Sequence, residues 1–255
     1  MKKTALFLAI SALASAPAFA NTFVNGGFEA GDLSGWTGGG GSWFGSPIAP
    51  VSPSTYAGGT PNNTVVSPGL DPLTGLPQVY AGAYAARVND RVNNYSVSTL
   101  TQSVTNYTDN NIYFAWQAVL QASHDLYDSD YFSLTLHDDT DNVDVVSRAY
   151  SSAGSIGSGT GSAVWTSPKN NNWFTAGWVV EAIDLTTAGA GGTSIVGHDF
   201  TLTLLGSDCP YGGHAGYVYL DGFGSTIPQA PEPASLALLS LGLLGLGAAR
   251  RRRAA

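Results

Sequence analysis

The single cysteine of this 255-residue chain, Cys209, precedes His214 by five positions. A thiol becomes a nucleophile as its thiolate, and a neighbouring imidazole can accept the proton. No Asn or Asp in a recognisable family motif completes a catalytic set with these two residues. The segment 208–214 (DCPYGGH) is more simply interpreted as a loop that enters a strand. We therefore expect a buried structural thiol, and a lone cysteine excludes an intramolecular disulfide.

Acidic side chains gather in the middle of the chain and could bind a cation. The group comprises Asp138, Asp139, Asp141 and Asp144, joined by Asp125, Asp128 and Asp130. The region 139–144 lacks the glycine and the distal glutamate of an EF-hand loop. We expect a pair of solvated hairpin tips, with a second ion site as the less favoured alternative. The four histidines show no metal-ligand spacing, and the chain has neither a Gly-x-Ser-x-Gly elbow nor a Walker loop.

Three tryptophans sit beside Gly, Ser and Asn residues and are candidates for glycan contact: Trp43, Trp165 and Trp173. Their rings could stack on the C–H faces of sugars. Packing under a loop is the alternative for each of them. Trp116 lies inside a dense apolar run, and we expect it in the core.

The elements that must position these side chains are predicted to be β-strands. Tyr131 to His137 alternates apolar and polar residues, and the run 112–120 (IYFAWQAVL) is typical of a strand buried on both faces. Further strands are expected at 80–88, 97–104, 143–150, 178–185, 200–205 and 216–223. No long helical period is present between residues 21 and 228.

Two stretches are expected to be mobile loops, 38–77 and 151–162, because Gly, Pro, Ser and Thr dominate them. About eight short antiparallel strands in a domain of this size favour an all-β fold. We predict a two-sheet antiparallel sandwich of the jelly-roll type over residues 21–227.

The N-terminus has the layout of a secretory signal. Two lysines precede the apolar run 5–16, and Ala18-Phe19-Ala20 supplies the small residues that signal peptidase needs. Cleavage is expected between Ala20 and Asn21, which makes residues 1–20 a signal peptide.

The C-terminal residues 228–255 are predicted to form a membrane-associated tail. An uncharged stretch at 234–249 is followed by four arginines, which resist translocation across the inner membrane. At 16 residues the stretch is about 24 Å long as a helix, shorter than the roughly 30 Å hydrocarbon core. A short span of this kind suits a transient signal better than a permanent anchor.

Between these ends the chain is strongly acidic. Four cations face 17 acids between residues 21 and 230, which gives a net charge of −13. Such a surface repels nucleic acid and anionic lipid and attracts divalent cations. Fifteen of those acids are Asp, which favours turns over helices.

The tail resembles the PEP-CTERM sorting signal. Pro231, Glu232 and Pro233 come first, a short Leu/Gly/Ala helix follows, and Arg250, Arg251, Arg252 and Arg253 end the motif. The resemblance implies recognition and removal by exosortase at the surface of a Gram-negative bacterium, often together with exopolysaccharide production. An ordinary C-terminal anchor is the alternative, although it leaves Pro-Glu-Pro unexplained.

The domain itself resembles galactose-binding-like jelly rolls, which include carbohydrate-binding modules. The resemblance rests on the spaced segments 25–36 (NGGFEAGDLSGW), 82–88 (GAYAARV), 100–104 (LTQSV) and 216–221 (GYVYLD). It implies a structural Ca²⁺ held by Glu29 and Asp221, since oxygen ligands from the two chain ends can clip the terminal strands together. Glu29 as a turn cap and Asp221 as a surface strand end are the alternative.

These observations favour a non-enzymatic exported protein at the cell surface or in the extracellular matrix, associated with exopolysaccharide. A dedicated carbohydrate-binding protein with a defined glycan site is the first alternative. A secreted hydrolase is the second, and it requires two convergent carboxylates in a pocket.

Overall fold

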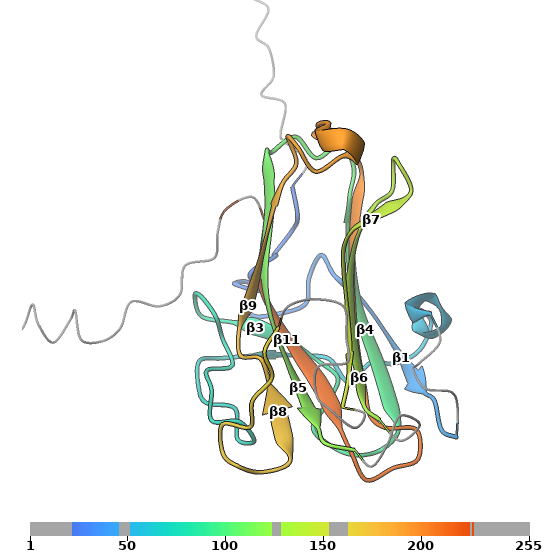
Figure 1. Ribbon diagram of the computed structural model, residues 1–255, viewed down its shortest axis with the longest axis vertical. Coiled ribbons are helices and arrows are strands. Elements are labelled where there is room, and N and C mark those ends of the chain that lie inside the picture. Colours follow the sequence, from blue (N-terminus) through green and yellow to red (C-terminus); the bar gives the residue numbers. More distant parts are fainter. Residues whose placement is uncertain (1–21, 46–51, 124–128, 153–162, 225, 227–255) are drawn as a thin grey trace, which may run out of the picture.

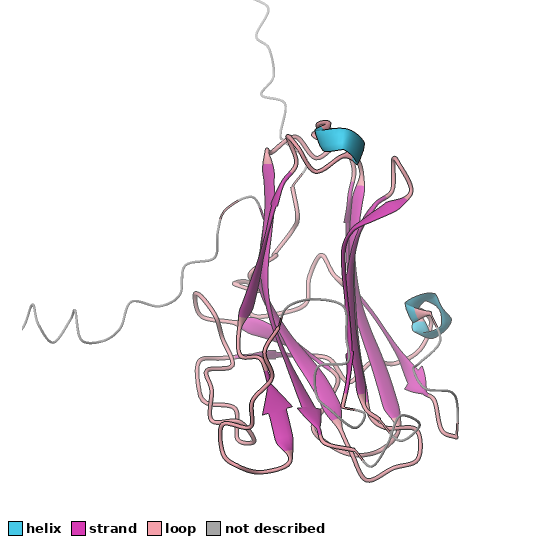
Figure 2. Cartoon of the chain, in the orientation of Figure 1, coloured by secondary structure: helices cyan, strands magenta, loops and turns pink. Residues whose placement is uncertain are grey.

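The computed structural model describes residues 22–45, 52–123, 129–152, 163–224 and 226. These residues form two antiparallel β-sheets that face each other, with two short 3-10 helices outside them (Figures 1 and 2). Within these ranges no helix is long and apolar enough to cross a membrane. The predicted signal peptide and sorting tail lie outside the described residues.

The first sheet has five strands in the order β1-β4-β10-β6-β7. Figure 1 shows it on one side of the sandwich. Its strands are β1 (Thr37–Ser42), β4 (Ser96–Val104), β10 (Phe200–Ser207), β6 (Tyr131–Asp138) and β7 (Val143–Ser151). Strands from distant parts of the sequence are therefore neighbours in this sheet.

The second sheet has six strands in the order β2-β3-β11-β5-β8, with β9 also paired to β5. Its strands are β2 (Thr64–Val66), β3 (Ala85–Val88), β11 (Gly216–Gly224), β5 (Asn111–Gln121), β8 (Trp173–Thr175) and β9 (Val179–Asp184). The short helices are η1 (Pro53–Tyr56) and η2 (Ala190–Gly192). The predicted all-β, two-sheet antiparallel sandwich is confirmed.

The core lies between the sheets and follows the alternation seen in the sequence. In β6, Phe132, Leu134 and Leu136 are fully buried, whereas the residues between them are partly exposed. Trp116 of β5 faces them from the other sheet, with its ring centre 4.9 Å from that of Phe132. Because both partners are large and fully buried, this contact joins the two layers.

The predicted loop at 38–77 is wrong in part, because it contains β1, η1 and β2. β1 has the sequence TGGGGS, and its glycines make room for a chain segment that crosses it. A Cβ on Gly39 would lie 2.4 Å from the carbonyl oxygen of Tyr56, and one on Gly40 would lie 2.3 Å from that of Thr60. The glycine run is thus a strand that another segment covers closely.

Two other boundaries differ from the prediction. The strand expected at 80–88 begins only at Ala85. Residues 80–84 instead form a turn whose backbone N–H groups donate to the carboxylates of Asp221 and Glu29. β8 is three residues long and was not predicted. The loop expected at 151–162 lies almost entirely outside the described residues.

Candidate functional site

The two predicted calcium ligands lie near opposite ends of the domain's sequence. Asp221 lies in β11, and Glu29 follows a turn in which Phe28 has a φ of +59°. The backbone N–H of Phe223 donates to the carbonyl of Gly26 at 3.0 Å, which holds the N-terminal segment against β11. The fold therefore brings the two carboxylates to the same place beside β11.

Both carboxylates accept hydrogen bonds from one turn. Asp221 Oδ2 accepts from the backbone N–H groups of Tyr80 and Ala81, each at 2.9 Å. Glu29 Oε1 accepts from those of Ala83 at 3.0 Å and Tyr84 at 3.2 Å. Neither carboxylate is an isolated surface charge, because together they hold residues 80–84 in place.

A cavity of about 250 Å³ lies between these groups, and we refer to it as the carboxylate cavity. It is lined by Gly27, Glu29, Ala81, Gly82, Asp221, Gly222, Phe223, Gly224 and Thr226. A Cβ on Gly82, whose φ is +71°, would lie 2.3 Å from Glu29 Oε1. The absence of a side chain at this position therefore keeps the Glu29 carboxylate in reach of the turn.

The cavity brings two carboxylates together, and among the described residues only backbone N–H groups donate to them. The pKa of Asp221 is raised to about 7, mainly by burial and in smaller part by the negative charge of Glu29, against the lowering effect of the backbone N–H donors. A divalent cation between the two carboxylates would offset both the burial and the repulsion. Two carboxylates, backbone groups and a cavity of this size fit an oxygen-ligated Ca²⁺.

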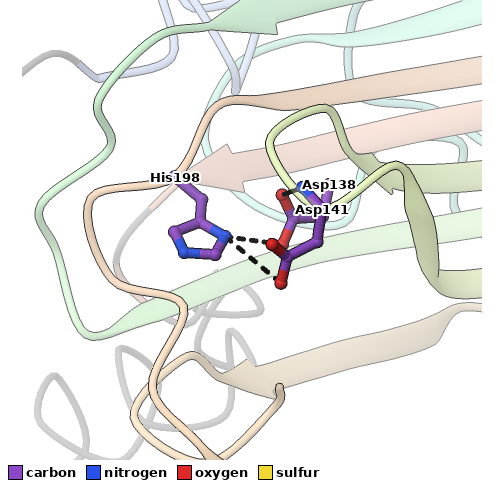
Figure 3. Close-up of side chains that lie close together, drawn as sticks. All are labelled: Asp138, Asp141 and His198. Carbon is purple, nitrogen blue, oxygen red and sulfur yellow. Dashed lines mark hydrogen bonds and ion pairs between the residues drawn. The ribbon is translucent and has the colours of Figure 1, made fainter. Parts of the chain in front are cut away.

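A second group of potential ligands lies at the β6–β7 hairpin (Figure 3). His198 Nδ1 lies 2.8 Å from Asp138 Oδ2 and 3.9 Å from Asp141 Oδ2. The other oxygen of the buried Asp138 accepts from the backbone N–H groups of Thr140 and Asp141. Since these bonds already hold the turn, the group stabilises the hairpin. The expectation of a solvated tip is wrong for Asp138, and also for Asp130, because both are fully buried. Asp125 and Asp128 lie outside the described residues.

The outward face of the five-stranded sheet carries a row of hydroxyl groups that spans all five strands. In the strand register Thr37 pairs with Thr101, Thr101 with Thr203, Thr203 with Thr135, and Thr135 with Ser147. The backbones of adjacent residues in the row are separated by about one strand spacing, roughly 4.8 Å, so their side chains lie within reach of one another. Thr101 Oγ1 donates to Thr203 Oγ1 at 3.3 Å.

A second polar row runs parallel to the first. Ser103 pairs with Thr201, Thr201 with His137, and His137 with Asp144. The hydroxyls of Ser103 and Thr201 are 2.8 Å apart, and His137 Nδ1 lies 2.8 Å from Asp144 Oδ1. The hydrogen bond to Asp144 raises the pKa of His137. No pattern within a single strand predicts these rows, because they arise from pairing between strands.

Part of this face is hollowed into a groove of about 330 Å³, which we refer to as the polar groove. It is lined by Thr37, Gly38, Gly39, Pro53, Ser54, Ala57, Thr99, Thr101 and Thr203. The helix η1 forms one wall, and the sheet forms the floor. The lining holds five hydroxyl groups and no charged side chain, so it can exchange hydrogen bonds with a neutral, hydroxyl-rich ligand.

The three candidate tryptophans have different environments. Trp43 is only 4% exposed, packs with Tyr56, and donates from Nε1 to the carbonyl of Asp208 at 2.7 Å. Trp43 is therefore a core residue, which removes it from the candidates for glycan contact and agrees with the alternative that it packs inside the domain. Trp165 is partly buried against Tyr150, with ring centres 5.2 Å apart. Trp173 is partly exposed at the second sheet and remains a candidate.

The expected structural thiol fits the observed geometry. Cys209 is fully buried, and its Sγ donates to the carbonyl of Gly212 at 2.9 Å. The backbone N–H of Cys209 also donates to the carbonyl of His214 at 3.1 Å. The segment is a tight loop between β10 and β11, as its sequence indicated.

The comparison with protein families decides the nature of the C-terminus. Residues 229–253 match the PEP-CTERM protein-sorting motif. The match contains the Pro-Glu-Pro triplet and the arginine cluster, so the predicted sorting tail is confirmed. The PEP-CTERM motif implies an exported protein that exosortase processes. No curated protein matches this chain.

Solved structures with a similar arrangement of strands include carbohydrate-binding modules. TmCBM61, in complex with β-1,4-galactotriose, is 13% identical with a TM-score of 0.40 and covers 80% of this chain and 97% of its own. CBM27-1 of Caldicellulosiruptor saccharolyticus, in complex with mannohexaose, is 13% identical with a TM-score of 0.36 and covers 82% and 97%. The enzymatically active domain of bacteriophage CBA120 tailspike protein 4 is 10% identical with a TM-score of 0.38 and covers 80% and 21%. Similarities this low identify no ligand for this chain.

Proposed function

We propose that this chain is a non-enzymatic, exosortase-sorted protein of the cell surface or extracellular matrix, whose β-sandwich contacts extracellular polysaccharide through the polar groove. The observation that carries the proposal is the row of hydroxyls across five strands, with the groove set into it. Signal peptidase would release the domain before Asn21, and exosortase would act on the tail. The membrane contact is then transient, and the final location is the surface or matrix of a Gram-negative bacterium.

A polysaccharide fits the groove because its own hydroxyls both donate and accept hydrogen bonds. Thr99, Thr101 and Thr203 offer hydroxyls of the same dual kind from neighbouring strands. Each such bond contributes on the order of 1 kcal/mol, so affinity must come from several contacts along an extended chain. Weak and repeated binding of this type suits a matrix protein.

We also propose that the carboxylate cavity holds a structural Ca²⁺ ligated by Glu29 and Asp221. The cation would join the N-terminal segment, the 80–84 turn and β11. Without it, one backbone hydrogen bond between Phe223 and Gly26 and the bonds from the turn's N–H groups to the two carboxylates connect these segments. This role is structural, since it fixes the two ends of the domain and leaves the polar groove untouched.

A hydrolase would need two carboxylates that converge on a substrate. Glu29 and Asp221 converge on a cavity, but each accepts hydrogen bonds from the 80–84 turn. Carboxylates engaged in this way are suited to hold a cation or a turn more than to transfer protons. This contact pattern favours the non-enzymatic proposal over the hydrolase.

The test is native affinity electrophoresis of the full chain in gels that contain neutral polysaccharides, among them galactan, mannan and mixed-linked glucan. Retention should fall at least fivefold in the double variant Thr101→Val/Thr203→Val, because valine preserves the shape and removes the hydroxyl. Thr105→Val, an exposed change just outside β4, is the matched control and should behave as wild type. Equal retention of the groove variant and the control would rule out the groove.

A further inference from the structure

Three side chains that line neither the carboxylate cavity nor the polar groove converge beside the β6–β7 hairpin (Figure 3). They are Asp138 at the end of β6, Asp141 in the turn to β7, and His198 just before β10, and we refer to them as the hairpin cluster. One ligand atom of each lies within 4.8 Å of the others. His198 is 60 positions from Asp138 in the sequence, so the fold and not a local motif brings the imidazole to the carboxylates.

The two carboxylate oxygens of Asp138 have different partners. Oδ1 accepts from the backbone N–H groups of Thr140 at 3.0 Å and Asp141 at 3.1 Å, which are the bonds that stabilise the hairpin. Oδ2 lies 2.8 Å from His198 Nδ1 instead. Because the Asp138 side chain is fully buried and Oδ1 is held by the turn, Oδ2 is fixed in its direction toward the imidazole. The stability of the hairpin is therefore compatible with a metal ion bound at Oδ2.

The imidazole of His198 is also held in place by its surroundings. The backbone N–H of His198 donates to the carbonyl of Ile195 at 3.2 Å, and its carbonyl accepts from the backbone N–H of Tyr107 at 2.9 Å. Its ring lies over that of Phe200, with centres 6.5 Å apart and an angle of 24° between the planes. A metal binds more tightly to ligands that are oriented before it arrives, since less freedom is lost on binding.

Asp141 supplies the third ligand atom from the exposed side of the cluster. Its side chain is 53% exposed, and its Oδ2 lies 3.9 Å from His198 Nδ1, which is too far for a hydrogen bond. A metal ion bound at roughly 2 Å to nitrogen and oxygen ligands holds neighbouring ligand atoms roughly 3 Å apart. The observed separations of 2.8 Å and 3.9 Å lie on either side of this value. A small movement of the exposed Asp141 side chain would therefore complete the site.

The charge around the hairpin cluster favours a cation. Two carboxylates face one imidazole, and a third carboxylate, that of Asp139, belongs to the same turn. The arginines and lysine of the described residues donate elsewhere: Arg87 to Asn89, Arg91 to Asp71, Arg148 to Glu181 and Lys169 to Pro72. A divalent cation would therefore offset negative charge that no described arginine or lysine compensates.

The ligand atoms indicate which cation the cluster would take. Ca²⁺ and Mg²⁺ prefer oxygen ligands alone, whereas an imidazole nitrogen suits a transition metal such as Zn²⁺. Zn²⁺ also accepts carboxylate oxygens, and where the protein supplies three ligands water takes the fourth position. Binding at Nδ1 requires the neutral tautomer of His198 with its proton on Nε2, because Nδ1 must then present a lone pair.

We propose that Asp138, Asp141 and His198 bind one Zn²⁺ ion, or another divalent transition metal, with water in the remaining position. The ion would join the β6–β7 turn to the segment before β10. This site differs from the proposed Ca²⁺ site in both its residues and its ligand chemistry, and it goes beyond the proposed contact with polysaccharide.

The experiment titrates the full chain, in detergent, with Zn²⁺ by isothermal titration calorimetry. His198→Asn keeps an amide donor near the position of Nδ1, so the bond to Asp138 is retained while the metal ligand is removed. Asp141→Asn changes an exposed carboxylate, so the variant should fold as wild type does. Each change should raise the Kd for Zn²⁺ at least tenfold, because even the loss of a residue that orients a ligand has an effect of this size. Asp139→Asn, in the same turn, and Asp221→Asn, in the carboxylate cavity, are the controls and should stay within twofold of wild type.

The outcomes separate this site from the proposed function. Weaker binding in both ligand variants, with both controls unchanged, supports the site. If wild type binds no Zn²⁺, or if His198→Asn and Asp141→Asn bind it as tightly as wild type, the proposal is overturned and the cluster only stabilises the hairpin. If Asp221→Asn alone weakens binding, Zn²⁺ occupies the carboxylate cavity and the proposal is again overturned. None of these results alters retention by polysaccharide, which is measured separately with the groove variants.

Discussion

Glu29 and Asp221 lie 192 positions apart in the sequence, yet both accept hydrogen bonds from the same turn. Asp221 accepts from the backbone N–H groups of Tyr80 and Ala81. Glu29 accepts from those of Ala83 and Tyr84. The charge of Glu29 contributes to the raised pKa of Asp221. The two ends of the domain are thus coupled both through a shared backbone segment and through repulsion between their carboxylates. A cation in the carboxylate cavity would turn this repulsion into attraction.

Calcium is expected to stabilise the domain. At a free Ca²⁺ concentration 100 times the Kd, ligand linkage adds about 2.7 kcal/mol to the free energy of unfolding. For a domain of this size that corresponds to a rise in Tm of roughly 5–10 °C, which EDTA should reverse. Differential scanning calorimetry of wild type and Asp221→Asn measures it, with Asp139→Asn as the control. A wild-type Tm indifferent to both Ca²⁺ and EDTA would refute the site.

Calcium affinity is expected to depend on pH through Asp221. Its pKa of about 7 means that the carboxyl is protonated in more acidic solution, and Ca²⁺ must then displace the proton. The Kd should rise by about tenfold for each pH unit below the pKa and level off above it. Isothermal titration calorimetry between pH 5 and pH 8 would reveal this slope. A constant Kd over that range would contradict the assignment of Asp221 as a ligand.

Without calcium, the stability of the domain should fall as pH rises from about 4 to about 7. The pKa values of Asp208 and Asp221 are raised to about 6 and about 7, so over this range the folded state binds more protons than the unfolded state. The free energy of unfolding therefore decreases until both groups are ionised. Urea denaturation at several pH values in EDTA tests this, and Asp221→Asn should remove the part of the fall nearest pH 7.

The glycine run of β1 is expected to be intolerant of side chains. Gly40→Ala places a methyl group against the carbonyl of Thr60, and such overpacking costs about 1–3 kcal/mol. The Tm should drop by roughly 2–4 °C for each kcal/mol. Gly58→Ala is the matched control, since a Cβ there meets nothing within 4 Å. Similar Tm values for the two variants would show that the close contact over β1 is absent in solution.

Processing of the two chain ends can be measured by mass. We expect an N-terminus at Asn21 and loss of the tail in a host that contains exosortase. Replacing Pro231, Glu232 and Pro233 by alanine should retain the tail and leave the protein in the membrane fraction. Mass spectrometry of the secreted and membrane fractions distinguishes these products. Release of the alanine variant at a normal level would show that the triplet is dispensable for sorting.

Local patterns predicted those parts of the protein that depend on local physics. The alternation in β6 and the dense apolar run in β5 predicted strands, because burial on one or both faces imposes such patterns directly. β1 was not predicted, because its glycines show no alternation of apolar and polar residues. It forms a strand because it pairs with β4 and because residues 56–60 pack closely over it. The sequence did not decide between exposure and packing for Trp43 for a similar reason, since its burial depends on Tyr56 and Leu205.

The sequence by itself determined the sorting motif, the all-β class and the strongly acidic domain, because each of these is a property of composition or of contiguous residues. Only the tertiary structure decided which side chains meet. The hydroxyl rows need the register of five strands. The left-handed backbone of Tyr95 is held between two N–H groups that donate to the distant carboxylate of Asp208. Contacts of this kind join residues far apart in the chain, and their free energy appears only when the strands are paired and water has left the core.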